Sequence, residues 1–152
     1  MIDDSVPRKS FLPIVRELVR CYQAFESRSA QHIRIMGLTP AQFDIVATLG
    51  NTEGMSFKEL GDKTLITKGT LTGVVDRLEA KHLVSRIACP TDGRSQIVRL
   101  TAKGEDSFKE VFPAHLSHLS RVFTDYSAAD LRQAESTLRR LRDALEGTEK
   151  ST

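Results

Sequence analysis

Hydrophobic residues recur at helical spacing along most of this 152-residue chain. In residues 11–36 they fall every three or four positions, which predicts a long amphipathic helix that ends at Gly37. The segment Thr39–Gln42 then places an N-cap threonine before a proline at the first helical position and a glutamine at the capping-box position. A second helix is therefore expected to run to about Leu49.

Two further helices are expected after a turn at residues 50–54. Ser56 is placed to cap a short helix that ends near Lys63, and Thr67 is placed to cap a longer one that ends near Lys81. The apolar residues of the longer helix fall on one of its faces: Leu71, Val74, Val75 and Leu78.

The pattern then changes from helical to β-prone. Val84–Ala88 and Gln96–Leu100 favour strands, and the segment Pro90–Gly93 between them consists of strong turn formers. The sequence therefore predicts a hairpin with a polar, basic tip. Thr101 should cap a second long helix, whose apolar stripe reaches Phe123.

The last two helices have distinct signatures. Pro113 lies inside the second long helix and should kink it. A final helix opens at residues 127–130, and its leucines alternate at three and four positions like a coiled-coil seam.

A short helix, a tight connection, a longer helix and a hairpin follow one another in the order of a winged helix-turn-helix. The predicted fold class is therefore mainly α, with a small antiparallel wing sheet and long helices near both termini. The apolar stripes of those helices are longer than the central lobe can cover, which favours a partner, although packing within the chain is the alternative.

Positive charge is concentrated in the middle third of the chain. Residues 56–103 hold nine Lys or Arg against five Asp or Glu, a balance of +4, whereas residues 1–55 balance at zero and residues 104–152 carry −2. This distribution fits a compact footprint on a phosphate backbone.

The predicted helix that begins at Thr67 offers small polar and basic side chains opposite its apolar face. Its threonines can bond base edges or phosphates, its glycines permit close backbone approach, and its basic residues can neutralise phosphates. The candidate contacts are Thr67, Lys68, Gly69, Thr70, Thr72, Gly73, Arg77 and Lys81, together with Lys58 on the preceding short helix.

Residues 57–104 resemble the MarR family, the multiple-antibiotic-resistance regulators, and the terminal helices match as well. The segments that carry the resemblance are Lys58-Glu59-Leu60-Gly61, Thr67-Lys68-Gly69-Thr70-Leu71-Thr72, Val75-Asp76-Arg77-Leu78-Glu79, Leu83-Val84-Ser85-Arg86, Asp92-Gly93-Arg94-Ser95, Val98-Arg99-Leu100-Thr101 and Lys103-Gly104. Val75-Asp76-Arg77-Leu78-Glu79 followed by a wing with Asp92 and Arg94 is more specific in combination than any one segment.

The resemblance implies one domain over residues 1–152, in a two-fold dimer that binds a palindromic operator in double-stranded DNA, usually as a repressor. Residues 8–36 and 104–146 would form the dimerisation helices, and residues 39–103 the DNA-binding lobe. Asp92 would brace the wing while Arg94 enters the minor groove. Many relatives carry a second arginine where this chain has Gly93, so Arg94 would be the main probe.

Relatives often bind small aromatic acids or phenols between the dimer helices and the reading lobe. The candidates for such an effector site here are Arg16, Arg20, Tyr22, His32 and His115. The alternative interpretation, that these are ordinary surface and interface groups, stays open. His115 and His118 share a helix face but have no further ligand at local spacing, so neither a metal nor a cofactor is predicted.

Thiol or electrophile sensing is an alternative within the same fold. Cys21 follows a basic residue and Cys89 lies at the wing base, where a nearby cation could lower a thiol pKa. Inert cysteine is the competing interpretation. Two cysteines are too few for a disulfide framework.

Other classes explain the pattern less well. The chain has no apolar run near the roughly 20 residues of a membrane span, and the acids after Met1 do not suit a secretory signal, so a cytoplasmic location without a membrane partner is expected. An enzyme is not expected, because nucleophile-elbow, phosphate-loop and zinc-protease motifs are missing. A helical adaptor that does not bind DNA would leave the hairpin and the central charge unexplained, and single-stranded RNA binding would need exposed aromatics.

Overall fold

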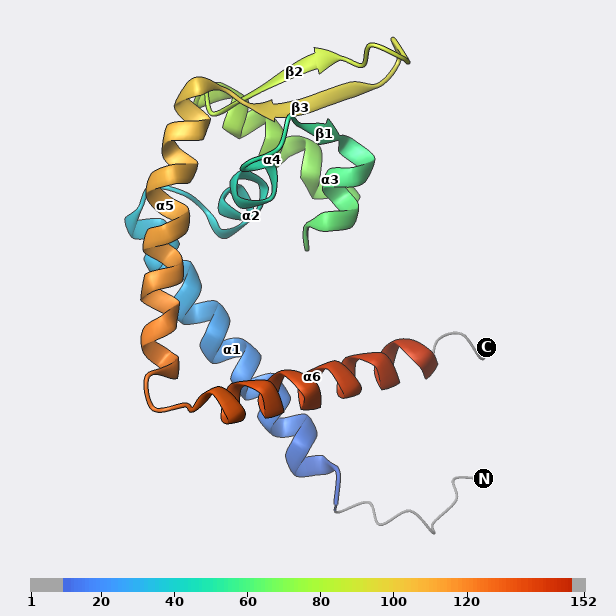
Figure 1. The fold of residues 1–152 in the computed structure, drawn as a ribbon. Helices are drawn as coiled ribbons and strands as arrows, with labels where there is room; N and C mark the ends of the chain where they lie inside the picture. Colours follow the sequence, from blue (N-terminus) through green and yellow to red (C-terminus); the bar gives the residue numbers. More distant parts are fainter. Residues whose placement is uncertain (1–9, 149–152) are drawn as a thin grey trace. The chain divides into compact units, whose positions relative to one another are not determined.

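The computed structural model of the chain describes residues 10–148 (Figure 1), so Met1 and residues 8 and 9 of the first predicted dimerisation segment lie outside the described part. The elements, in chain order, are α1 (Leu12–Ile35), α2 (Pro40–Leu49), β1 (Met55–Ser56), α3 (Phe57–Lys63), α4 (Lys68–Ala80), β2 (Val84–Ala88), β3 (Gln96–Leu100), α5 (Ala102–Ser120), the 3₁₀ helix η1 (Arg121–Phe123) and α6 (Ala128–Thr148). Most predicted boundaries are therefore confirmed to within one or two residues.

The chain divides into two compact units. The first, Met1–Leu116, holds α1 to β3 and most of α5, whereas the second, Ser117–Thr152, holds the end of α5, η1 and α6. The second long helix was predicted to reach Phe123, and this was wrong, because α5 ends at Ser120 and η1 follows.

The small sheet is antiparallel, with β3 between β1 and β2. Val84 pairs with Leu100 and Arg86 with Val98 in the predicted hairpin, while Met55 of β1 pairs with Val98 on the other side of β3. Sequence analysis missed β1, because a two-residue strand is too short to show alternation.

The hydrophobic core of the first unit lies among α2, α3, α4, the sheet and the first half of α5. The predicted apolar face of α4 is confirmed as buried. The largest side chains with almost no exposure are Ile45, Val46, Leu49, Leu60, Val75, Leu78, Val84 and Val98. These contacts hold α4 by its inner face only, which leaves its opposite face to solvent.

Helix caps explain why α2, α3 and α5 begin where they do, and the predicted Ser56 cap of α3 is confirmed, since its hydroxyl accepts from Glu59 N–H at 3.1 Å. The predicted capping box of α2 is confirmed, since Gln42 N–H donates to the Thr39 hydroxyl at 3.2 Å and Thr39 N–H donates to the Gln42 side chain at 3.1 Å. Thr101 caps α5 as predicted, accepting from Gly104 N–H at 3.0 Å. Thr67 occupies the N-cap position of α4, but its predicted side-chain cap was wrong, because its hydroxyl pairs with the Thr70 hydroxyl at 2.9 Å.

The turn that follows α4 contains a left-handed residue, His82, with φ of +61°. Its N–H donates to Glu79 O, and Leu83 N–H donates to Leu78 O, the hydrogen-bond pattern of a helix C-terminus that glycine favours. We predict that His82→Gly raises the free energy of unfolding by about 1 kcal/mol, because glycine has no Cβ to disfavour positive φ. Urea titration of the two proteins measures this, and a less stable variant would contradict it.

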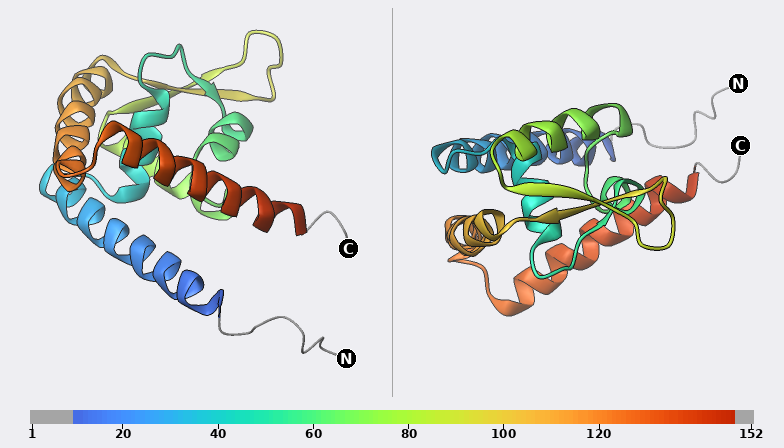
Figure 2. Two further views of the ribbon diagram at one scale, coloured as in Figure 1. Left: turned by 60° about the horizontal axis from the view of Figure 1, so that its bottom comes forward. Right: turned by 90° about the horizontal axis from the view of Figure 1, so that it is seen from above.

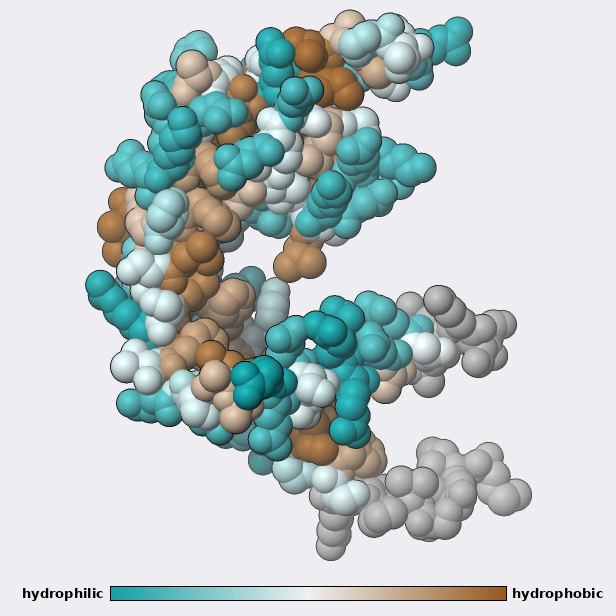
Figure 3. Space-filling view, in the orientation of Figure 1, coloured by the Kyte–Doolittle hydropathy of each residue, from teal (hydrophilic) through white to brown (hydrophobic). Residues whose placement is uncertain are grey.

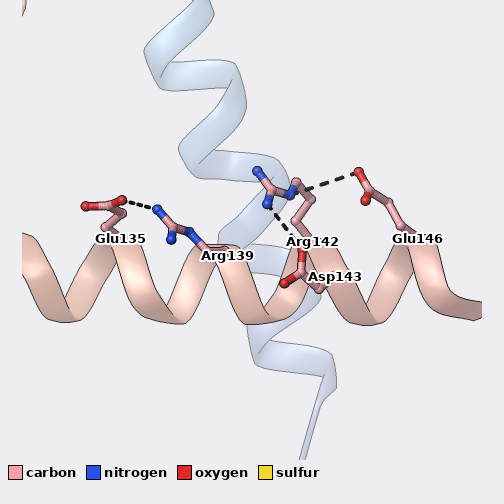
Figure 4. Close-up of polar contacts among 5 residues, drawn as sticks. All are labelled: Glu135, Arg139, Arg142, Asp143 and Glu146. Carbon is pink, nitrogen blue, oxygen red and sulfur yellow. Dashed lines mark hydrogen bonds and ion pairs between the residues drawn. The ribbon is translucent and has the colours of Figure 1, made fainter.

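α6 of the second unit has a charged face and a leucine stripe. Glu135 pairs with Arg139, and Arg142 pairs with Asp143 and with Glu146, at 3.2 and 4.0 Å (Figure 4). Glu135–Arg139 and Arg142–Glu146 are one turn apart, and such pairs support a solvated helix face. None of the helices in residues 10–148 has the length and apolar character needed to cross a bilayer.

Candidate nucleic-acid interface

The connection between α3 and α4 is fixed by side-chain hydrogen bonds. The buried Thr64 hydroxyl donates to Leu60 O at 2.7 Å, and the Asp44 carboxylate of α2 accepts from Leu65 N–H at 3.1 Å. Burial raises the pKa of the Asp44 carboxyl, and the hydrogen bond from Leu65 partly offsets this by stabilising the ionised form. The start of α4 is therefore held at a defined position on the lobe.

The outer face of α4 is small, polar and exposed. Gly69 and Gly73 have no atom within 4 Å of the place where a Cβ would stand, so another molecule can approach the helix backbone closely. Gly73 is half-buried. The exposed candidates are Thr67, Lys68, Gly69, Thr70, Thr72 and Arg77, with Lys58 exposed on α3. These side chains are all open to solvent, and their contacts with DNA stay a prediction.

Lys81 differs from the other basic candidates. Its ammonium donates to Gly37 O and to the Gln42 side chain, both at 3.0 Å. In this conformation it ties the end of α4 to the turn between α1 and α2, and its contact with a phosphate stays a prediction.

The wing tip is closed by Asp92. Its carboxylate accepts from Arg94 N–H at 3.0 Å and from the Ser95 hydroxyl at 3.1 Å, while Cys89 N–H donates to Ser95 O at 2.9 Å. Arg94 is exposed at the end of this turn. The hairpin tip projects past α3 (Figures 1 and 2), so the position of Arg94 suits contact with a large ligand.

Sequence analysis missed the partners of Arg86 on β2. Its Nη2 contacts Asp76 Oδ1 and its Nε lies 3.5 Å from Glu79 Oε2, both on α4. Its guanidinium carbon lies 5.5 Å from the centroid of the Phe57 ring at the start of α3. Arg86 therefore contacts α3 and α4 from the wing strand. The only signal in the sequence was the opposite charge of these side chains.

Two of the five effector candidates come together. His32 Nδ1 of α1 lies 3.0 Å from His115 Nδ1 of α5, and His115 Nε2 lies 3.0 Å from the Ser29 hydroxyl. The Phe43 ring of α2 meets the His115 ring edge to face, with centroids 4.8 Å apart. Sequence analysis missed Ser29 and Phe43, although Ser29 precedes His32 by one helical turn.

The other three effector candidates lie elsewhere. Arg16, Arg20 and Tyr22 are exposed and precede His32 on α1 by at least ten residues, which is about 15 Å of helix. They do not join the pair of histidines. Within residues 10–148, His, Cys, Asp and Glu side chains form no group of three or more that could hold a metal ion.

The two cysteines have different surroundings. Cys21 is exposed on α1, and Cys89 is partly buried at the base of the wing tip. The Cys89 sulfur lies 3.3 Å from the Thr91 hydroxyl. Hydrogen bonds from the Thr91 side chain and from the backbone of Thr91 and Asp92 lower the pKa of the Cys89 thiol.

A short helix, a fixed turn, a longer helix with an exposed polar face and a hairpin with a basic tip define a winged helix-turn-helix of the DNA-binding class. Comparison with known proteins gives the particular family. The chain belongs to the MarR family of transcriptional regulators, whose family model matches residues 36–95. The resemblance and the fold class inferred from the sequence are thus confirmed.

Individual relatives support this assignment over most of the chain. The HTH-type transcriptional regulator MhqR of Bacillus subtilis (strain 168) is 31% identical over 124 residues, 82% of this chain and 86% of that protein. The HTH-type transcriptional repressor MdtR of the same species is 26% identical over 129 residues, 85% and 83% of the two chains. A solved structure of Bordetella bronchiseptica BpsR, whose DNA binding 6-hydroxynicotinic acid regulates, has a TM-score of 0.79 at 27% identity and covers 90% of this chain and 98% of that one.

Proposed function

We propose that this protein is a homodimeric repressor of transcription that binds a palindromic operator and releases it when a small aromatic effector binds. The observation that carries the proposal is the exposed, small and polar outer face of α4 beside the held, basic tip of the wing. Such a helix fits the major groove, where each base pair presents a distinct pattern of donors and acceptors.

The DNA contacts proposed for α4 and the wing are made to bases, to phosphates and to the minor groove by different kinds of side chain. Thr70 and Thr72 bond base edges or phosphates, and one hydroxyl of the Thr67–Thr70 pair keeps its O–H available for such an acceptor. Lys58, Lys68 and Arg77 neutralise phosphates, and Gly69 and Gly73 admit the backbone to the groove. Arg94 enters the minor groove, with Asp92 holding its turn in shape.

Assembly into a dimer is supported by apolar side chains that a single chain leaves exposed. They repeat at helical spacing over the first half of α1, and hydrophobic side chains also reach the surface over α5 (Figure 3). A continuous apolar stripe of this length on a folded chain marks an association surface. The exposed large hydrophobic residues of α1 and α6 include Phe11, Leu12, Ile14, Val15, Leu18, Val19, Tyr22, Phe25, Leu131, Leu138 and Leu145.

An aromatic effector is supported by the cluster of Ser29, His32, Phe43 and His115. Both ring nitrogens of the buried His115 are engaged by His32 and Ser29, so a carboxylate or phenol would have to replace these hydrogen bonds, with the Phe43 ring as an aromatic neighbour. The relative BpsR is regulated by an acid of this chemical type. The effector site proposed at this cluster does not include Arg16, Arg20 or Tyr22.

Selection of bound sequences from random duplex DNA tests the proposed function. We expect a palindrome whose half-sites lie about one helical turn apart, and a dimer in sedimentation at micromolar concentration. Adding hydroxylated aromatic acids to the binding assay should then release the selected duplex. No enrichment, or a monomer in sedimentation, would contradict the proposal.

The lowered thiol pKa of Cys89 favours a second candidate function, a regulator that senses oxidants or electrophiles at the wing. In a Cys21→Ser background, Thr91→Val should slow alkylation of Cys89 by iodoacetamide at pH 7. Loss of the Thr91 hydroxyl removes the largest cause of the lowered pKa and so reduces the thiolate fraction. Thr91→Ser keeps the hydroxyl and should keep the rate. Equal rates in all three proteins would count against this function.

A further inference from the structure

The Arg86 side chain is enclosed, whereas its acidic partners are not. Its side chain is 20% exposed, against 59% for Asp76 and 48% for Glu79. Arg86 pairs with the fully buried Val98 in the hairpin register, so it projects from the same face of the sheet as core residues. The guanidinium thus lies between β2, α3 and α4, with the two carboxylates on its outer side.

The location of Arg86 in the basic middle third of the chain would suggest a phosphate contact. Its geometry argues otherwise, because the guanidinium is directed at Asp76, Glu79 and the Phe57 ring. To reach a phosphate it would have to leave all three. These contacts also neutralise two carboxylates that α4 would otherwise present close to a polyanion.

α4 packs against the lobe through the apolar side chains of Leu71, Val74, Val75 and Leu78. Apolar contacts by themselves are not directional. An arginine adds direction, because its planar fork has a fixed geometry toward carboxylates. Arg86 joins the C-terminal half of α4 to the strand that leads directly to the wing tip. It therefore acts where the spacing between the α4 threonines and Arg94 is determined.

We propose that Arg86 is a positioning residue for DNA recognition: through Asp76, Glu79 and Phe57 it fixes the angle of α4 against the wing without contacting DNA itself. This inference rests on the proposed function, because it concerns how α4 and the wing reach one duplex together. If a recognition element is misplaced, its contacts with specific bases are weakened more than its nonspecific attraction to phosphates.

Four variants test the inference against simple electrostatics: Arg86→Gln, Arg86→Lys, Asp76→Ala and Arg99→Gln. The measurement is the ratio of affinities for the selected operator and an unrelated duplex, over a range of salt concentrations. We expect Arg86→Gln and Asp76→Ala to lower this ratio by about tenfold or more. Arg86→Lys should recover only part of it, because an ammonium lacks the fork.

Arg99→Gln is the matched control, since Arg99 is exposed on β3 and pairs with Ser85, next to Arg86. It removes one positive charge from the same hairpin and should leave the ratio unchanged. Asp76→Ala separates the two explanations most clearly, because it removes a negative charge and places a good helix former in α4. Electrostatics alone predicts that it binds every duplex more tightly.

Three outcomes would overturn the inference. One is an equal loss for both duplexes in Arg86→Gln with a salt slope smaller by about one per subunit, which indicates a phosphate contact. Another is tighter binding of both duplexes by Asp76→Ala at an unchanged ratio. The third is a ratio in Arg86→Gln equal to that in Arg99→Gln. Failure of the proposed function itself would be separate, since the wild-type protein would then prefer no duplex.

Discussion

Arg94→Ala should abolish most operator binding while leaving the fold intact. Arg94 is exposed at the wing tip, and the turn is closed by its backbone N–H and by Ser95 rather than by its side chain. A specific arginine contact is worth about 1–3 kcal/mol, and a dimer presents two wings, so operator affinity should fall at least about thirtyfold. Fluorescence anisotropy with a labelled operator measures the loss.

The control for Arg94→Ala is Arg99→Ala. It removes the same side chain from the same hairpin, but from an exposed position on β3 rather than from the tip. We expect a small change in affinity and the same melting temperature in both variants. If Arg94→Ala bound the operator as tightly as wild type, the wing would have no part in recognition.

Gly104→Ala should cause the largest loss of stability of any single methyl addition considered. A Cβ at residue 104 would lie 1.9 Å from Leu83 O, which cannot withdraw easily because it also accepts from Thr101 N–H at 3.0 Å. Overpacking against backbone costs about 1–3 kcal/mol or more, so we expect the melting temperature to fall by roughly 5–10 °C.

Gly61→Ala provides the comparison for Gly104→Ala. Gly61 is also helical, but its added Cβ would meet only Leu71 Cδ2, at 3.6 Å, an ordinary van der Waals contact. Alanine is the better helix former there and should leave stability equal or higher. Equal melting temperatures for the two variants would mean that α5 shifts freely away from the sheet, contrary to the hydrogen bonds at its start.

The parts of the fold that sequence analysis predicted well are those with local signals. The capping box at Thr39 and Gln42 and the apolar face of α4 depend on residues three or four positions apart. The hairpin between Val84 and Leu100 likewise follows from adjacent strand and turn segments. In each case the energetic preference is contained in one short segment, so composition and spacing reveal it.

Contacts between distant segments were harder to predict. The histidines of the effector cluster were both named as candidates, yet their pairing joins residues 32 and 115. The partners of Arg86 and the inward hydrogen bonds of Lys81 depend on how α4 packs against its neighbours. Opposite charges occur throughout the chain, and only the packed structure selects which of them meet.

The hydrogen bonds of Lys81 have a consequence for how quickly the protein finds DNA. Both acceptors, Gly37 O and the Gln42 amide oxygen, are uncharged, so the ammonium keeps its full charge at a fixed position behind α4. A charge held at this position contributes to the long-range field that draws a polyanion toward the surface, whether or not it contacts a phosphate. We therefore expect Lys81 to contribute to the rate of diffusional encounter with DNA.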